Sequence, residues 1–494
     1  MFMRYVPETV AHELRYRHWW RCSRCALLHS PNPRIRVDSR RSAICAGMLM
    51  RQTLMLLMCT AVSGIALADA PMHHWLVDAD DFADDMSSAQ RVEIEQMLAR
   101  NRLLLARHLQ TIQPSDAEIS TQIAQEIMAQ KSSAHIEQIA QTGLAWPLSA
   151  NTNFIGFDYH GISNFVDHDP RFPGFVKDYT CGTRTYDNAA GYNHAGTDYF
   201  LWPYPWLMMD QEQVAIVAAA AGQIIGKSDG NFDRSCAMGN GEWNAVYVQH
   251  TDGTVAWYGH MKSGSVTSKS IGANVAVGEF LGDVGSSGSS TAPHLHFELH
   301  GPNGDIVDPR HGQCNAAPDL WAITQAYEQP TINSLSTHSA EPSFVACGVS
   351  DGQPVDENPQ YQDAFEPAAT LWVFAAYHDQ RNGEITHFSI ERPDHSVWQA
   401  WDFDLASEGL PKPFYAGTGW DWSYVLPADA PHGLWTINAE FQGQAYAHAF
   451  TVGSAESRDV GAVAAERARI AVLLARCRPG NTPVPADCSS TRHP

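Results

Sequence analysis

The sequence predicts a mainly β protein, in which a helical segment precedes two antiparallel β domains. Residues 146–312 are rich in glycine, aromatic and β-branched residues, with strand-like runs separated by turn signals. Residues 330–453 contain further short strand-like runs at the spacing of a β-sandwich, and residues 69–145 show helical periodicity. A length of 494 residues exceeds one ordinary core and agrees with several domains.

The first 68 residues differ in charge from the rest of the chain. Residues 1–47 hold nine arginines against three acidic residues, whereas the whole chain has a formal net charge of −22. Residues 48–68 contain a basic residue, a short apolar run and a small-residue pattern, which predict a secretory signal peptide cut after Ala68. We therefore expect translation to start at Met48 or Met50, which would make residues 1–47 an artefact. A genuine N-terminal extension is the alternative.

Residues 69–145 are predicted to form two amphipathic helices. The first follows Ser88, and the second opens at Ser115, where Glu118 completes a capping box. The apolar positions of the first helix are Val92, Met97, Leu98, Leu104 and Leu105. Two such helices need a surface to cover, so we expect a propeptide-like segment on the next domain. An ordinary helical subdomain is the alternative.

The C-terminal β domain, residues 330–453, is rich in tryptophan. Exposed tryptophans could stack on sugars or bind a partner, but more often they fill a sandwich core, and we expect that for most of them. They are Trp372, Trp398, Trp401, Trp420, Trp422 and Trp435. Residues 454–494 are predicted to form a C-terminal helix and tail.

Six cysteines follow the predicted signal peptide, which suggests three disulfides in an exported protein. They are Cys181, Cys236, Cys314, Cys347, Cys477 and Cys488. Nearness in sequence favours the pairs Cys181–Cys236, Cys314–Cys347 and Cys477–Cys488, although the sequence alone leaves the pairing open. Since none of the six lies in a C-x-x-C pair, a cysteine zinc site is not expected.

The stretch "HLHFELH" carries the first chemical signal. On a strand, His294, His296, Glu298 and His300 point to one face, and the apolar residues between them point to the other. His-x-His alone is also found on ordinary surfaces. The stretch "NHAGTDYF" adds His194 and Asp198 on a loop that enters a strand, although a surface pair would look the same.

Together, His194, Asp198 and His296 form the three-ligand set of a catalytic zinc, which leaves one position for water. His260 ends a strand in "WYGHM" and by itself would be an ordinary turn histidine. In this order, over roughly residues 193–309, the three motifs resemble the lysostaphin-type zinc metalloendopeptidases, peptidase family M23.

The resemblance implies that Zn²⁺ is held by His194, Asp198 and His296. It makes His260 and His294 the catalytic histidines, so all five family positions are filled. With less specificity it places Asn244 and Ser290 along the substrate groove. Glu298 and His300 have no role in the family pattern, and we expect them to support the ligands or lie on the surface.

We therefore predict an exported zinc metalloendopeptidase, extracellular or periplasmic, that hydrolyses peptidoglycan cross-bridges or stem peptides. The chain has no H-E-x-x-H motif, so one of His260 and His294 must act as the base. The other would stabilise the oxyanion or protonate the leaving amine. The Gly- and Ser-rich loop from Gly282 to Pro293 is expected to form one wall of the groove.

Two alternatives remain. The substrate could be a Gly-rich extracellular protein, which the acidic charge favours over an anionic cell wall. The protein could instead be a non-catalytic, zinc-containing module that binds carbohydrate or a partner. The acidic charge argues against nucleic acid as a partner, and the apolar run before Ala68 is too short to predict a lasting membrane anchor.

Overall fold

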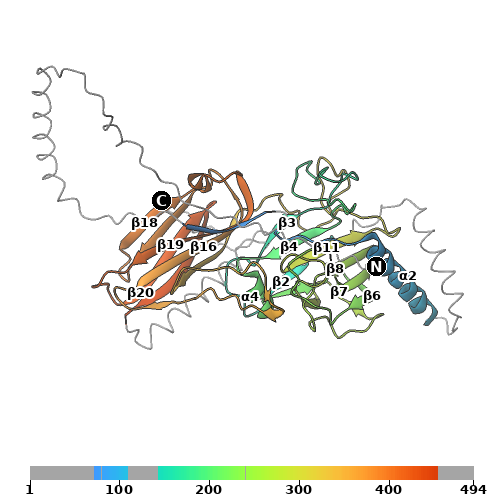
Figure 1. Cartoon of the computed structure of the whole chain (residues 1–494), viewed down its shortest axis with the longest axis horizontal. Coiled ribbons are helices and arrows are strands. Elements are labelled where there is room, and N and C mark those ends of the chain that lie inside the picture. The colour runs from blue at the N-terminus through green and yellow to red at the C-terminus, as the bar shows by residue number, and fades with distance from the viewer. Residues whose placement is uncertain (1–71, 79–80, 109–142, 240, 454–494) are drawn as a thin grey trace, which may run out of the picture. The chain divides into compact units, whose positions relative to one another are not determined.

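The computed structural model describes residues 72–78, 81–108, 143–239 and 241–453 (Figure 1). The predicted leader, signal peptide, second helix, C-terminal helix and Cys477–Cys488 pair lie outside these residues. The fold is mainly β, as predicted, and its paired strands are antiparallel apart from a short parallel pair between β15 and β21. Neither described helix is long and apolar enough to cross a membrane.

The N-terminal β domain is built on a seven-stranded sheet of order β3-β4-β11-β8-β7-β6-β9, beside a three-stranded sheet of order β10-β5-β2. Its strands are β2 (Leu148–Ala150), β3 (His160–Asn164), β4 (Thr197–Leu201), β5 (Val214–Val217), β6 (Gly222–Ser228), β7 (Ala245–His250), β8 (Val255–Gly259), β9 (Asn274–Val275), β10 (Phe280–Asp283) and β11 (His294–His300). A short helix, α4 (Pro205–Asp210), follows β4. The polar motif strand β11 therefore lies inside the sheet, between β4 and β8.

The C-terminal β domain consists of a four-stranded sheet, β1-β19-β16-β12, and a five-stranded sheet, β15-β21-β20-β17-β18, which share one core. Its elements are β12 (Thr331–His338), β13 (Val349–Ser350), β14 (Gln353–Pro354), β15 (Ala364–Phe365), β16 (Thr370–Arg381), β17 (Thr386–Glu391), β18 (Val397–Phe403), η2 (Leu405–Glu408), β19 (Phe414–Val425), β20 (Gly433–Phe441) and β21 (Gln444–Val452). Trp420, Trp422 and Trp435 are buried in this core, and Trp398 and Trp401 pack partly buried against it. These tryptophans are core residues, as expected.

The segment before the N-terminal β domain is not purely helical. Met72–Val77 forms strand β1, which pairs antiparallel with β19 and completes a sheet of the C-terminal β domain. The prediction of a mostly helical segment missed this strand. A six-residue run has no helical signal of its own, and its partner lies more than 300 residues away in the sequence.

The first predicted helix is present as α2 (Ser88–His108), but its predicted apolar face was only partly right. Leu98 is buried and Met97 and Leu105 pack against the core, whereas Val92 and Leu104 are exposed. At about 100° per residue, Val92 and Leu104 lie roughly 120° to either side of Leu98, outside the packed face. The buried face includes Arg91 instead, for a reason that lies in the site described below.

The disulfides join Cys181 to Cys314 and Cys236 to Cys347, so the two predicted pairs among these four cysteines were wrong. Nearness in sequence failed because each bond crosses between loops that are 133 or 111 residues apart. Closing loops of this length stabilises the folded state by roughly 4–5 kcal/mol each in the chain-entropy description. Cys236–Cys347 also ties the loop after β6 to the loop after β12.

Candidate metal centre and active site

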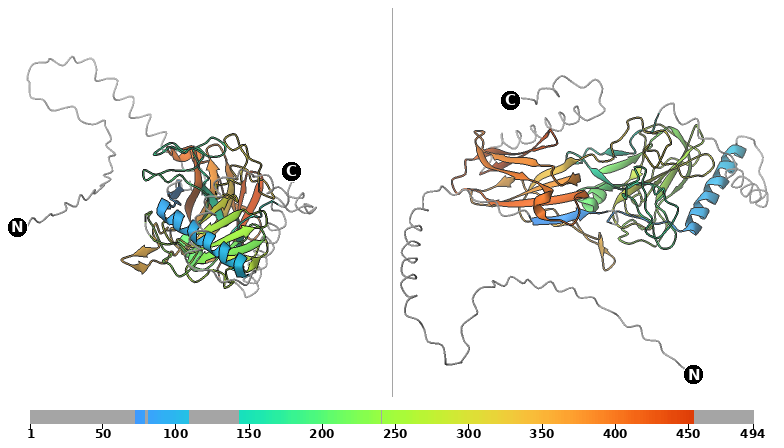
Figure 2. Two further views of the ribbon diagram at one scale, coloured as in Figure 1. Left: turned by 90° about the vertical axis from the view of Figure 1, so that its right-hand side faces the viewer. Right: turned by 90° about the horizontal axis from the view of Figure 1, so that it is seen from above.

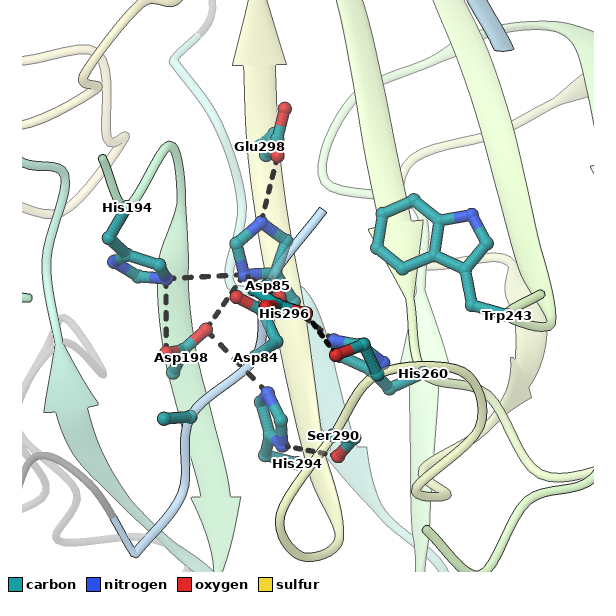
Figure 3. A network of polar contacts seen from close by, with 12 residues as sticks. Asp84, Asp85, His194, Asp198, Trp243, His260, Ser290, His294, His296 and Glu298 are labelled. Atoms are coloured by element: carbon teal, nitrogen blue, oxygen red, sulfur yellow. Dashed lines mark hydrogen bonds and ion pairs between the residues drawn. The ribbon is translucent and has the colours of Figure 1, made fainter. Parts of the chain in front are cut away.

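Three adjacent strands bring the predicted site residues together (Figure 3). In the β11 register, His296 lies opposite Asp198 of β4 on one side and Gly259 of β8 on the other. His260 follows β8 directly, in the left-handed backbone region at φ 59°. A non-glycine residue held there indicates that the surrounding structure fixes its backbone.

His194, Asp198 and His296 form a buried cluster of possible metal ligands. Asp198 Oδ2 lies 3.0 Å from His194 Nε2, and Asp198 Oδ1 lies 2.8 Å from His296 Nδ1. Burial alone would raise the pKa of Asp198, but His194 and the hydrogen bonds of both histidines lower it to about 2. The close approach of the His296 ring explains why the "HAGTD" motif has glycine at position 196, because a Cβ on Gly196 would lie 2.7 Å from that ring.

The hydrogen bonds at the far side of each ring leave the inner nitrogens free to bind a metal. His194 Nδ1 lies 2.7 Å from the carbonyl oxygen of Phe165, which can only accept, so Nδ1 donates, and in the neutral ring Nε2 carries the lone pair. His296 Nε2 lies 3.0 Å from Glu298 Oε1 and donates to it, which leaves Nδ1. Two imidazole lone pairs and one carboxylate thus converge, and this donor set fits Zn²⁺.

His260 and His294 share a second arrangement. His260 Nδ1 lies 2.6 Å from Ser287 O, and His294 Nδ1 lies 2.7 Å from Ala292 O. Each carbonyl therefore fixes the ring with its Nε2 turned inward. Their ring centroids are 4.6 Å apart, and His294 Nε2 has no hydrogen-bond partner among the described residues.

Asp84, which belongs to none of the motifs recognised in the sequence, lies between the candidate metal ligands and the pair His260 and His294. Its Oδ2 lies 2.9 Å from His260 Nε2 and 2.9 Å from His296 Nδ1. Burial alone would raise the pKa of Asp84, but His296 and the hydrogen bonds to both histidines lower it well below its usual value. Asp84 is therefore a charged carboxylate among the candidate metal ligands. One of its oxygens lies within 4.8 Å of the possible ligand atoms of His194, Asp198 and His296.

Residues 207–309 match the sequence model described as peptidase family M23. The chain carries an M23 peptidase domain. The match contains His260, His294 and His296 and begins after His194 and Asp198, which join the site through β4. We refer to the N-terminal β domain as the M23 domain.

Curated relatives match this chain over short stretches. The DD-carboxypeptidase/endopeptidase Mpg of Neisseria meningitidis is 45% identical over 69 residues, which cover 14% of this chain and 15% of that protein. The glycyl-glycine endopeptidase ALE-1 of Staphylococcus capitis is 31% identical over 108 residues, or 22% of this chain and 25% of that one. The murein hydrolase activator EnvC of Escherichia coli is 32% identical over 119 residues, or 22% and 27%. The chain thus spans about a quarter or less of these relatives.

Two tyrosines of the M23 domain, also missed from the sequence, face Asp84. Tyr186 donates its hydroxyl to Asp84 Oδ1 at 2.6 Å, and Tyr192 donates to the same oxygen at 2.9 Å. Burial and nearby carboxylates, Asp84 first, raise the pKa of Tyr186 well above its usual value, so the hydroxyl keeps its proton. Isolated tyrosines in a loop carry no sequence signal for this placement.

Glu298 and His300, which the family pattern leaves without a role, are both buried in the M23 domain. Glu298 Oε2 lies 2.8 Å from His300 Nε2, while its Oε1 accepts a hydrogen bond from His296 Nε2. The His300 ring stacks on Trp257 with centroids 4.2 Å apart. Glu298 therefore supports the candidate metal ligand His296 and His300 supports Glu298, so neither is a surface residue.

Asn244 and Ser290 occupy the loops around the histidines. Asn244 Nδ2 donates to the carbonyl of Met261, next to His260, at 3.1 Å. Ser290 Oγ lies 3.4 Å from His294 Nδ1 and 2.8 Å from Ser286 Oγ. Both residues hold the loops that carry the catalytic candidates, and their predicted place along the substrate groove stays a prediction.

Proposed function

We propose that this protein is an exported zinc metalloendopeptidase that hydrolyses peptide bonds in peptidoglycan. One observation carries the proposal: the inner nitrogens of four histidines turn toward two buried carboxylates, Asp84 and Asp198, and each ring is fixed from behind by an acceptor. Three protein donors from two strands and a loop match the ligand set of a catalytic zinc. The histidine pair beside them supplies the acid–base groups.

His194 Nε2, Asp198 and His296 Nδ1 would hold the metal. When bound, Zn²⁺ polarises the scissile carbonyl and lowers the pKa of a water molecule toward neutrality. Because carbonyl oxygens hold the Nδ1 protons of His260 and His294, proton exchange takes place at their Nε2 atoms. One Nε2 accepts the proton of the attacking water, and the other donates to the leaving amine.

Tyr186 and Tyr192 would act beside the histidines. Their hydroxyls now donate to one oxygen of Asp84, a position that a substrate oxygen would take once Asp84 has moved away. Donors aimed at a developing negative charge in a dry site are a strong source of catalysis.

The substrate and location rest on the relatives and the disulfides. The relatives are named as a DD-carboxypeptidase/endopeptidase, a glycyl-glycine endopeptidase and a murein hydrolase activator, which favours peptidoglycan over other peptides. Two disulfides favour an oxidising compartment, outside the cytoplasm.

A non-catalytic role is the second candidate, because one relative is named as an activator and Asp84 fills the space between the histidines. An assay of peptidoglycan hydrolysis, in which newly released amino groups are measured, distinguishes the peptidase from the activator. The protein and its Asp84→Ala variant are assayed, and His294→Ala serves as the control. A Gly-rich protein is the second substrate, and the zinc content of every sample is measured. Cleavage that His294→Ala abolishes while retaining zinc supports the peptidase. Bound zinc with no cleavage by any form favours the activator.

A further inference from the structure

One loop of the M23 domain, residues 285–292, holds both catalytic candidates, and we name it the serine loop. The carbonyl oxygen of Ser287 lies 2.6 Å from His260 Nδ1 and accepts its hydrogen bond. At the other histidine, the carbonyl oxygen of Ala292 lies 2.7 Å from His294 Nδ1. The directions in which the two Nε2 atoms point therefore depend on where the serine loop lies.

A second segment, residues 233–237, holds the serine loop in place. Ser235 N–H donates to Ser286 O at 2.9 Å, and Ser286 N–H donates to Asp233 O at 3.0 Å. Ser286 Oγ donates to the Ser235 carbonyl at 2.7 Å and lies 2.8 Å from Ser290 Oγ. Because Ser286 and Ser290 are fully buried, loss of these hydrogen bonds would leave polar groups without partners, which is costly. This segment therefore fixes the position of the serine loop.

The C-terminal β domain reaches this segment through residues 344–358, between β12 and β15, which we name the clasp. The clasp contains the hairpin of β13 and β14, which forms a sheet of its own. In the right view of Figure 2 this hairpin, in amber, stands apart from the two larger sheets of its domain. Cys347 of the clasp is bonded to Cys236. The buried Glu357 of the clasp accepts hydrogen bonds from two N–H groups of α4, each at 3.1 Å.

Arg234 lies at the centre of this contact. Its Nε donates to Gly348 O at 2.8 Å and its Nη2 to Val355 O at 3.4 Å, and both carbonyls belong to the clasp. The guanidinium also forms an ion pair with Asp210, the last residue of α4, and lies 5.5 Å from the Trp206 ring centroid. The planar, rigid guanidinium can serve several acceptors at once. Arg234 thus joins the clasp and α4 to the segment that holds the serine loop.

We propose that Arg234 and the Cys236–Cys347 disulfide are positioning residues, through which the C-terminal β domain sets the geometry of His260 and His294. The inference rests on the proposed function, since it assumes that both histidines act in hydrolysis. The candidate metal ligands lie on β4, on β11 and just before β4, so the positioning acts on the acid–base pair rather than on zinc. The C-terminal β domain is then part of the catalytic scaffold.

The size of the effect follows from the precision that catalysis requires. A displacement of about 1 Å at reacting groups lowers a rate by roughly 10²-fold. The serine loop would keep its sequence and its own hydrogen bonds without the clasp, but it would lose the support behind it. Turnover should therefore fall while zinc stays bound and substrate affinity changes little.

Four variants of the full chain separate this role from general stability. Arg234→Met removes the donors at similar side-chain length, whereas Arg234→Lys keeps the charge. The double variant Cys236→Ser, Cys347→Ser removes the disulfide to the clasp. The control is Cys181→Ser, Cys314→Ser, which removes a disulfide of similar sequence separation, 133 residues against 111.

Two readouts are taken on zinc-loaded protein. Hydrogen–deuterium exchange of the serine-loop amides reports whether the loop is held. The values of kcat and KM for a soluble peptidoglycan fragment, expressed per bound zinc, report whether the histidines need it. Every protein in the kinetic series, the parent included, carries Asp84→Ala, so that Asp84 no longer engages His260 Nε2.

We expect faster exchange over the serine loop in Arg234→Met and in the Cys236, Cys347 variant. In both, kcat should fall at least roughly tenfold with KM changed by less than about twofold. Arg234→Lys should recover part of kcat, and the Cys181, Cys314 control should match the parent in both readouts. If the disulfide variant does not fold, the two Arg234 variants decide the question with the disulfide intact.

Three results would overturn the inference. If exchange and kcat in Arg234→Met equal those of a parent that cleaves, the inference is wrong and the proposed function stands. Faster exchange with unchanged kcat has the same meaning, because the serine loop would then move without disturbing the histidines. A zinc-loaded parent that cleaves nothing overturns the proposed function, and the inference with it.

Discussion

Glu298 and His296 lie two residues apart on β11, and Glu298 Oε1 is 3.0 Å from His296 Nε2. The hydrogen bond fixes the ring with Nδ1 turned to Asp198 and Asp84. Because Arg91 of α2 binds the same carboxylate, Glu298 links the ring of the candidate metal ligand His296 to this helix. Support of the ligand and anchoring of α2 thus depend on one side chain.

Replacing Glu298 with Ala should weaken zinc binding. Loss of a carboxylate that orients a ligating histidine typically costs roughly 10–100-fold in metal affinity. The dissociation constant, measured by competition with a chromophoric chelator, should rise by that factor, whereas Glu298→Gln, which keeps an acceptor oxygen, should retain most of the affinity. Unchanged affinity in Glu298→Ala would show that His296 needs no support from Glu298.

Replacing Phe82 with Ala should loosen the segment Phe82–Met86, which crosses the site and carries Asp84, while leaving His194, Asp198 and His296 in place. The ring is fully buried against Phe200, and truncation of such a ring typically costs about 3–5 kcal/mol of packing. Peptidoglycan hydrolysis by the full chain should rise several-fold at constant zinc content, and Phe82→Leu should behave more like the unaltered protein. A Phe82→Ala variant that is folded and zinc-loaded but no more active would contradict competition between this segment and the substrate.

Tyr186→Phe should lower kcat more than it raises KM. Its hydroxyl donates to the position that we assign to a substrate oxygen, and loss of such a donor costs about 10²–10³ in kcat at strong sites. The comparison is made in the Asp84→Ala background, where the Tyr186 hydroxyl no longer donates to the Asp84 carboxylate. A rise in KM with kcat unchanged would assign Tyr186 to ground-state binding instead.

Asp178→Asn should destabilise the folded protein in a pH-dependent way. Asp178 accepts hydrogen bonds from the Thr180 and Tyr327 hydroxyls and from the Gly182 and Arg184 N–H groups. Burial alone would raise the pKa of Asp178, but these bonds lower it below its usual value.

Because the folded-state pKa is depressed, the stabilisation is present above the unfolded-state pKa of about 3.9 and is lost as the pH falls through the folded-state pKa. Urea unfolding should therefore show a loss of about 1–3 kcal/mol for Asp178→Asn at pH 7 and a smaller difference near pH 3. An equal difference at both pH values would mean that the carboxylate charge does not matter there.

Part of the site could be predicted from local sequence pattern. The alternation in "HLHFELH" places His294, His296 and Glu298 on one side of β11, and the order of three motifs indicates which strands meet. Alternation does not report what covers that side. All seven residues of β11 are buried because Asp84, with the residues beside it, and Arg91 lie over the polar side.

The residues that the sequence did not indicate depend on contacts between distant parts of the chain. Asp84 is one of several acids in "DADDFADD", and only contacts with distant residues, such as His260 176 residues later, distinguish it from a solvated acidic run. The disulfide pairs and the β1–β19 pairing failed for the same reason, since all three depend on which loops and edges meet in the folded chain.

The most direct single measurement is mass spectrometry of the products released from purified peptidoglycan by zinc-loaded Asp84→Ala, beside the zinc-loaded double variant Asp84→Ala, His294→Ala. We predict that the single variant releases muropeptides with new amino termini and that the double variant, with equal zinc, releases none. Release of the same products by both proteins, or by neither, would contradict a metallopeptidase that works through His294.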